Sequence, residues 1–313
     1  MGRLEGKVAV VAGATRGSGR GIARMLGEAG ATVYCTGRST RGSPHPAGPY
    51  AGRPESIEDT ADLVNAAGGE GIAVRVDYEV EAEVRSLFER VKRERGQLDL
   101  LINVMSGQAV TSWEPFWQLS CLEGRAFYDS WVWKHLTASA YAAGLMVEQR
   151  SGLIVEVTEG DSLALSANLY WDLVKTSLAR SVYAMAEQLA EYGVSVVSVT
   201  PGYLRSEYAL DYHGVTESNW REAGVKDRYF RHSETPCFIG RAVAALAADP
   251  QVNAKSGGMY SSWNLSDEYG FKDIDGGQPH WGRDIGAEIA AQATHRTNVH
   301  WQIGLSHVNG GAR

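Results

Sequence analysis

Three glycines near the start of the chain have the spacing of a phosphate-binding turn. The segment GATRGSG holds Gly13, Gly17 and Gly19 directly after the apolar run Lys7–Ala12 and before residues with helical apolar spacing. Such a turn needs glycine because the chain bends sharply, its backbone approaches a pyrophosphate closely, and the next helix packs against the strand. The free amides at the helix start then point at the phosphates. The pattern predicts a dinucleotide site, with a ligand-free glycine turn as the alternative.

Two arginines near this turn indicate which dinucleotide binds. An NAD enzyme places Asp or Glu at the end of the second strand to hold the ribose hydroxyls, but here the residues Thr36–Ser39 contain no carboxylate. Arg38, and Arg16 within the glycine turn, have the chemistry to flank a 2′-phosphate through charge-assisted contacts. We therefore expect NADP(H), with NAD(H) less favoured. The alternative is that both arginines are exposed loop residues.

Alternating strand-like and helix-like segments position these residues. Seven short runs have strand character: Lys7–Ala12, Thr32–Thr36, Ala73–Val76, Leu98–Asn103, Leu153–Val157, Val194–Thr200 and, more weakly, Gly258–Ser261. Helical periodicity between them predicts right-handed crossovers and a single doubly wound parallel sheet of the α/β, Rossmann type. We expect this domain to cover residues 1–262, with residues 263–313 as an extension packed on it or partly flexible. The loop Ser39–Pro54 is expected beside the cofactor cleft.

Composition excludes several other classes of protein. The chain has 30 Lys and Arg against 37 Asp and Glu, a net charge of −7, which offers no basic field for nucleic acid. Its three cysteines are far apart and odd in number, as in a reduced cytoplasmic protein. No apolar run approaches the roughly 20 residues of a membrane span. No metal site is expected, because the histidines of the extension lack the spacing of a metal motif: His280, His295, His300 and His307.

Four motifs in order resemble the short-chain dehydrogenase/reductase family over residues 5–262. They are the GATRGSG turn, the LDLLIN segment ending at Asn103, the lysine of the YxxxK helix at Lys175, and PGYLRSE at Pro201–Glu207. The loop after Arg38 and the C-terminal extension are similar to those of a longer subgroup. The resemblance implies cofactor contacts from the glycine turn and the residues near it: Gly13, Thr15, Arg16, Gly17, Gly19 and Arg38. It also implies that Asp77 lies near the adenine and that Asn103 and Lys175 lie at the riboses. The residues implied at the nicotinamide are Pro201, Gly202 and Ser206.

The proton donor of that family is displaced in this chain. In the family a tyrosine four residues before the lysine protonates the developing alkoxide. Here that position is Trp171, which has no titratable proton near neutral pH. Tyr170 stands one residue earlier, and helical geometry turns it about 140° away from Lys175 unless the backbone is bulged there. Tyr170 is the best available proton donor, and packing elsewhere is the alternative.

The serine and asparagine positions of the family also differ. Thr158 falls at the serine position, where its hydroxyl can make the same hydrogen bond to a carbonyl, and Ser162 is a nearby substitute. The asparagine position falls on or near Trp131. His135 follows one turn later, although a lone helical histidine is more often structural. The catalytic set that we expect is Thr158, Tyr170 and Lys175.

These residues support three hypotheses about function. The first is an NADP(H)-dependent oxidoreductase acting on a ketone or secondary alcohol. The second is a protein of the same fold with an altered site, either a cofactor-binding pseudoenzyme or a non-redox enzyme; the third is a purely structural oligomer. Seven aromatic residues predict a large, flat or apolar small-molecule substrate, unless they form helix core or a subunit interface: Trp113, Phe116, Trp117, Phe127, Tyr128, Trp131 and Trp133. Apolar stripes within 136–147 and 178–189 are similar to those that pair in oligomers of that family and favour a homo-oligomer, either a dimer or a tetramer, although the sequence does not distinguish core from interface.

Overall fold

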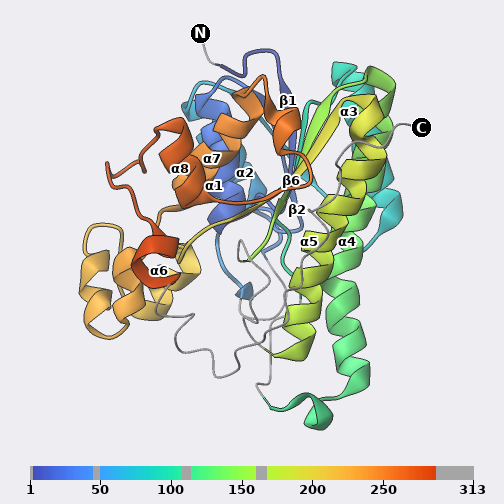
Figure 1. The fold of residues 1–313 in the computed structure, drawn as a ribbon. Helices are drawn as coiled ribbons and strands as arrows, with labels where there is room; N and C mark the ends of the chain where they lie inside the picture. The colour runs from blue at the N-terminus through green and yellow to red at the C-terminus, as the bar shows by residue number, and fades with distance from the viewer. Residues whose placement is uncertain (1–2, 45–49, 108–113, 160–167, 287–313) are drawn as a thin grey trace, which may run out of the picture.

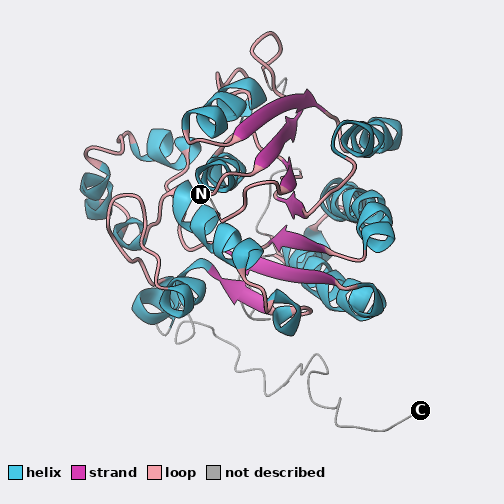
Figure 2. Cartoon of the chain, turned by 90° about the horizontal axis from the view of Figure 1, so that it is seen from above, coloured by secondary structure: helices cyan, strands magenta, loops and turns pink. Residues whose placement is uncertain are grey.

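A seven-stranded sheet forms the centre of the computed structural model, which describes residues 3–44, 50–107, 114–159 and 168–286. The order is β3-β2-β1-β4-β5-β6-β7, and all six neighbouring pairs are parallel. The strands are β1 (Val8–Ala12), β2 (Thr32–Gly37), β3 (Glu70–Arg75), β4 (Leu100–Asn103), β5 (Gly152–Val157), β6 (Val194–Thr200) and β7 (Met259–Ser261). Figure 2 shows the strands between two layers of helices. The α/β doubly wound sheet is thereby confirmed.

Helices cover both faces of this sheet. One layer holds α1 (Gly17–Glu28), α2 (Ile57–Ala66), α7 (Pro236–Ala248) and α8 (Ser262–Tyr269), and the other holds α3 (Glu81–Arg95), α4 (Cys121–Gln149) and α5 (Leu169–Leu189) (Figure 1). A short helix, α6 (Glu207–His213), follows β6. No helix within the described ranges is both long and apolar enough to cross a membrane.

The central strand β1 is buried along its whole length because both of its faces are covered. Side chains alternate across a strand, so Ala9 and Val11 join the core beneath α1 and α7, while Val10 joins the core beneath α3, α4 and α5. The continuous apolar run that predicted this strand thus reflects two separate cores. The sheet holds the carboxyl ends of β1, β4 and β5 at one edge, where the cofactor cleft of such folds lies.

The third strand starts earlier than its apolar run suggested. It begins at Glu70, three residues before the expected Ala73, because β3 is an edge strand and tolerates polar residues there. Gly71 belongs to this added part. A Cβ at Gly71 would lie 2.2 Å from the Ala61 carbonyl oxygen, so glycine allows α2 to close on the strand. At β4 the correction is opposite, because the strand begins at Leu100 rather than Leu98.

The described part of the C-terminal extension packs on the sheet domain. Trp263 and Leu265 are buried, and Leu265 joins the core beneath α1 and α7. The Asp273 carboxylate accepts a hydrogen bond of 2.8 Å from the Thr235 amide at the start of α7. Residues 287–313 lie outside the described ranges. The extension therefore contributes to the core as far as the structure describes it.

One of the two stripes that suggested a subunit interface belongs to the core. Leu178, Val182 and Leu189 of α5 are buried against the rest of the chain, so they are not available to a partner. The α4 stripe is less buried, since Leu136 packs only partly against its neighbours. Of the two interpretations that the sequence left open, core applies to these α5 residues, because α4 and the sheet cover that side of the helix.

Candidate active site

The glycine turn joins β1 to α1 in a conformation that only glycine allows. Gly13 has a φ of +96°, and a Cβ there would approach the Val104 backbone to 3.0 Å. A Cβ at Gly19 would lie 2.1 Å from the Gly13 carbonyl oxygen. The Thr15 side chain is buried in the turn, with its hydroxyl oxygen 2.8 Å from where a Cβ on Gly37 would stand. The turn is therefore closed on itself, with its amides at the start of α1.

A carboxylate already binds one of these amides. Glu207 Oε2 accepts a hydrogen bond of 2.8 Å from the Gly17 amide, and Glu207 Oε1 lies 3.2 Å from a guanidinium nitrogen of Arg20. Ser206 caps α6 through a 3.2 Å bond from the Ala209 amide, and a Cβ on Gly17 would touch the Ser206 side chain at 3.6 Å. The structure thus brings together two motifs separated by 190 residues in sequence. A negative group at a helix N-terminus is the chemistry of a bound diphosphate.

The two arginines each face a carboxylate. Arg38 Nη1 lies 3.9 Å from Asp77 Oδ2, which brings together the residues assigned to the adenosine end of the cofactor. Arg16 Nε is 3.3 Å from Glu55 Oε2, and its guanidinium stands 4.8 Å from the centre of the Tyr50 ring. Glu55 was not expected near the site. The sequence carried no signal for it, because the contact depends on how the loop after β2 returns to the glycine turn.

The loop after β2 also reaches α6. The Tyr50 and Tyr208 rings meet edge to face with their centres 5.6 Å apart, and Arg53 Nη2 forms an ion pair of 2.8 Å with Asp211 Oδ2. These contacts join the expected cleft loop to the helix that carries Glu207. The loop and α6 therefore close together over the glycine turn.

A buried polar cluster lies at the carboxyl ends of β4 and β5. Glu156 Oε1 accepts hydrogen bonds from Asn103 Nδ2 at 2.6 Å and Ser139 Oγ at 3.1 Å, and His135 Nδ1 stands 2.6 Å from Glu156 Oε2. His135 Nε2 lies 3.0 Å from the Met105 carbonyl, which can only accept, so Nε2 carries a proton. His135 is structural, as the commoner interpretation of a lone histidine has it.

This cluster changes the expected role of Asn103. Its side chain is fully buried, and its amide donates to Glu156 instead of facing the cleft. A charged residue inside the apolar strand LIVEV was the signal that sequence reasoning passed over. The cluster fixes the Met105 carbonyl, and with it the backbone that packs on Gly13.

Two tryptophans surround Lys175. Its Nζ lies 4.5 Å from the centre of the Trp131 ring on α4 and 4.6 Å from the centre of the Trp171 ring on α5. These distances are within the range of cation–π contacts. Burial lowers the pKa of Lys175 to about 8, although the negative charge of Glu159 opposes that shift. The residues at the asparagine and tyrosine positions of the family thus form an aromatic cage around the lysine.

Tyr170 points to another place. Its ring fills the space beside Gly124, where a Cβ would come within 2.2 Å of the ring, and Cys121 interacts with its hydroxyl. Gly124 and Trp131 are about two helical turns, or 10 Å, apart along α4. The structure therefore does not bring Tyr170 to Lys175, because α5 is regular from Leu169 and shows no bulge that would rotate the tyrosine inward.

The remaining expected residues frame the end of the sheet. Thr158 is buried directly after β5, where its amide donates to the Val199 carbonyl at 3.0 Å. Ser162 lies outside the described residues. After Pro201, the Gly202 amide donates to Glu234 Oε2 at 2.9 Å, and burial raises the pKa of Glu234 to about 8. Glu234 is a second buried carboxyl group that the sequence did not single out.

The aromatic cluster is divided by α4. Phe127 and Trp131 are buried on the side of Lys175, whereas Trp133 is 64% exposed. Trp133 follows Trp131 by two positions, and such residues point in directions about 200° apart around a helix. Phe116 and Trp117 are also exposed, and Trp113 is outside the described residues. The seven aromatic residues therefore do not form one ligand-binding wall.

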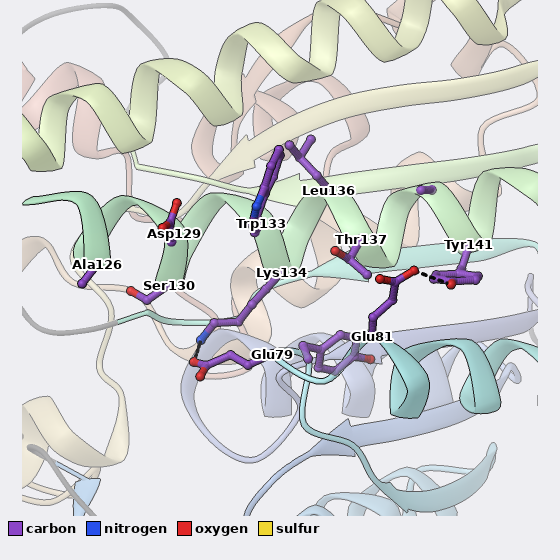
Figure 3. A pocket seen from close by; sticks show the side chains of 12 residues that line it. Glu79, Glu81, Ala126, Asp129, Ser130, Trp133, Lys134, Leu136, Thr137 and Tyr141 are labelled. Carbon is purple, nitrogen blue, oxygen red and sulfur yellow. Dashed lines mark hydrogen bonds and ion pairs between the residues drawn. The ribbon is translucent and has the colours of Figure 1, made fainter.

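A cavity of about 880 Å³ opens on the outer side of α4. Trp133, Lys134 and Tyr141 line it together with Glu79 and Glu81 (Figure 3). Lys134 Nζ forms an ion pair of 3.0 Å with Glu79, and burial lowers its pKa. The cavity is polar at its floor and is turned away from the Trp131 side of the helix, so we do not assign the substrate to it. Among the described residues, no three potential ligands gather as a metal site would require.

Comparison with known proteins agrees with this geometry. The family model described as short chain dehydrogenase matches residues 7–212. Dehydrogenase/reductase SDR family member 1 of Mus musculus is 35% identical over 279 residues, covering 87% of this chain and 85% of that protein. A short chain dehydrogenase of Mycobacterium thermoresistibile superposes with a TM-score of 0.71 at 18% identity, covering 87% of this chain and 90% of that one. YwfH, an NADPH dependent reductase involved in bacilysin biosynthesis, gives a TM-score of 0.66 at 18% identity, covering 82% and 96%.

Proposed function

Because the chain belongs to the short-chain dehydrogenase/reductase family, we propose that it is an NADP(H)-dependent oxidoreductase acting on a ketone or secondary alcohol. The observation that carries the proposal is the hydrogen bond from the Gly17 amide to the Glu207 carboxylate. This carboxylate occupies the kind of anion site that a diphosphate needs. The turn at Gly13 and Gly19 is tight, because a Cβ at either position would collide with neighbouring backbone atoms of the protein. The residues present therefore fit the cofactor.

Individual side chains are assigned as follows. Residues proposed to hold the cofactor are Gly13, Thr15, Arg16, Gly17, Gly19, Arg38, Asp77, Lys175, Pro201, Gly202 and Ser206. The bound cofactor supplies or accepts the hydride. Thr158 donates a hydrogen bond to the substrate carbonyl and thereby polarises it. Lys175 presents three N–H donors beside the nicotinamide ribose.

Three further features of the protein remain predictions. The three cysteines are free thiols, which supports a cytoplasmic location. Exposed apolar side chains at Leu122, Trp133 and Leu173 support a homo-oligomer. The substrate is a small molecule, and the indoles at Trp131 and Trp171 favour an aromatic or apolar one.

Titration with both coenzymes tests the cofactor proposal. We expect NADPH to quench the tryptophan emission in a saturable way, with NADH binding more weakly. Arg38→Glu should weaken NADPH binding by about 10- to 100-fold and leave NADH binding nearly unchanged, because a charge-assisted contact contributes about 1.5–3 kcal/mol. Arg125→Glu, at an exposed position of α4, is the matched charge control. Equal loss of both coenzymes in Arg38→Glu, or no quenching by either in the parent chain, would contradict the proposal.

A second titration tests whether Glu207 competes with the diphosphate. Glu207→Gln removes a negative charge from the Gly17 amide and from Arg20, so we expect NADPH to bind about tenfold more tightly at low salt. Glu187→Gln on the exposed side of α5 should change nothing. Weaker or unaltered binding in Glu207→Gln means that the carboxylate and the diphosphate do not share one site.

The altered catalytic positions support a second candidate function. Trp171 and Trp131 replace the proton donor and the relay residue of the family, and Tyr170 packs on Gly124. A cofactor-binding protein without a redox step is consistent with that arrangement. Assaying NADPH oxidation across a panel of ketones and aldehydes separates the two functions, because only the oxidoreductase turns over.

A further inference from the structure

The aromatic cage around Lys175 comes from two helices, α4 and α5. The Trp131 and Trp171 rings meet edge to face with their centres 5.2 Å apart, and Phe127 packs at 6.2 Å from the first and 6.1 Å from the second. Trp171 is one helical turn before Lys175, so its indole lies along the lysine stem. The ammonium is therefore held in one place by the faces of two indoles.

The other titratable groups near this cage are either hydrogen-bonded to other residues or are acidic side chains. On α4, His135 is bound to Glu156 and the Tyr128 hydroxyl donates to Ser177 Oγ at 2.9 Å. After β5, Glu159 is the charged group whose field acts on Lys175. Asp172, on α5 itself, is likewise acidic.

Indole and hydroxyl groups do not replace the missing acid. Neither indole has a titratable proton near neutral pH, and the Thr158 hydroxyl can donate a hydrogen bond without becoming an acid. The Tyr170 ring fills the space beside Gly124, and its hydroxyl interacts with Cys121 rather than with Lys175. Among the described residues, the ammonium of Lys175 is therefore the one dissociable proton that the cage presents.

We propose that Lys175 itself is the acid that protonates the substrate oxygen, in place of the displaced tyrosine. This inference rests on the proposed oxidoreductase function. The carbonyl carbon accepts a hydride, with its electron pair, from C4 of the reduced nicotinamide, and the π electrons of the C=O bond move to oxygen. That oxygen takes a proton from the Lys175 ammonium and becomes the alcohol hydroxyl. The neutral amine regains a proton from solvent, and in the oxidation direction the amine accepts the proton instead.

The environment of Lys175 suits this role. A general acid works best with a pKa near the operating pH, and burial brings this pKa from 10.5 to about 8. The ammonium still predominates at pH 7, and the indole faces favour that charged form until substrate arrives. An exposed lysine would be protonated as well, but it would be a weaker acid.

Lys175→Arg distinguishes the positive charge of Lys175 from its ability to give up a proton. Guanidinium keeps the positive charge but does not give up its proton, so at saturating NADPH we expect the carbonyl reduction rate to fall by about 100-fold or more. In the parent chain the reduction rate should fall as pH rises through about 8, because the amine then replaces the ammonium, and that limb should vanish in the variant. Lys226→Arg, at an exposed lysine, is the matched control.

A spectroscopic titration tests the same point without turnover. In full-length protein labelled with ¹³C at the lysine ε-carbons, the signal that disappears in Lys175→Arg should titrate with a midpoint near 8. A midpoint of 10 or above overturns the inference. If Lys175→Arg fails to fold, the parent's pH profile decides, and a reduction rate that does not fall between pH 7 and 9 overturns it.

The remaining outcomes distinguish the inference from the function beneath it. A parent chain that oxidises NADPH, together with a Lys175→Arg variant of equal rate and equal pH profile, refutes the lysine acid and leaves the oxidoreductase standing. A loss of rate in Tyr170→Phe as large as in Lys175→Arg assigns the proton to Tyr170 and refutes the lysine acid too. If the parent binds NADPH but reduces no carbonyl in the panel, the oxidoreductase proposal fails and the inference fails with it.

Discussion

Trp171→Tyr is expected to raise the rate of carbonyl reduction by about 10- to 100-fold. The substitution places a phenol one helical turn before Lys175, at the position now held by an indole 4.6 Å from its Nζ. A neighbouring ammonium lowers the pKa of a phenol, and a positioned general acid contributes typically 10²–10⁴-fold to a rate. We expect a gain below that range, because in our proposal the parent already has an acid in Lys175. Initial rates of NADPH oxidation with a fixed ketone measure the change.

Trp171→Phe is the matched control for that experiment. It opens the same cage by nearly the same volume but adds no hydroxyl, so the difference between the two variants isolates the phenol. We expect Trp171→Phe to gain no activity, because it supplies no acid. Equal rates in Trp171→Tyr and Trp171→Phe would show that the tryptophan does not stand in the place of the proton donor.

Glu156→Ala is expected to lower the free energy of unfolding by about 3–5 kcal/mol. The substitution leaves His135, Asn103 and Ser139 without their shared acceptor inside the sheet, and removing one partner of a buried pair costs about this much. It should also weaken NADPH binding, since His135 holds the Met105 carbonyl beside the glycine turn. Urea unfolding and the coenzyme titration measure the two effects.

Two further variants show what Glu156 contributes. Glu156→Gln keeps the shape of the side chain and retains one acceptor oxygen, so it should destabilise less than alanine does. Glu89→Ala, on the exposed side of α3, should change stability by less than about 0.5 kcal/mol. A Glu156→Ala variant as stable as Glu89→Ala would show that the cluster is not a structural anchor.

The sheet and the glycine turn were predictable because their signals are local. Each strand appears as a short apolar run, and the spacing of Gly13, Gly17 and Gly19 lies within seven residues. The errors at β3 and β4 affect only where a strand begins, since an edge strand accepts residues such as Glu70 that an apolar run does not include. The α5 stripe was correctly recognised as apolar, but the sequence left open whether it is core or interface, because periodicity does not say what covers a helix face.

The polar contacts of the site were not predictable in the same way. Glu55, Glu156, Glu207 and Glu234 each bind a group from another part of the chain, up to 190 residues away for Glu207 and the Gly17 amide. Only Glu156 left a trace, as a charge within an apolar strand. Contacts of this kind depend on the sheet order and on loop paths, which neither periodicity nor composition contains.

The sequence by itself determined a doubly wound α/β fold, because short apolar runs and helical periodicity are local properties, and its resemblance to the family implied a lysine kept and a tyrosine replaced. Only the tertiary structure decided that Tyr170 faces Gly124, that Trp131 and Trp171 enclose Lys175, and that Glu207 meets the glycine turn. The physical reason is that a side chain's chemistry depends on what surrounds it. For Lys175, those surroundings come from α4 and α5. The position of these two helices relative to each other depends on how both pack on the sheet.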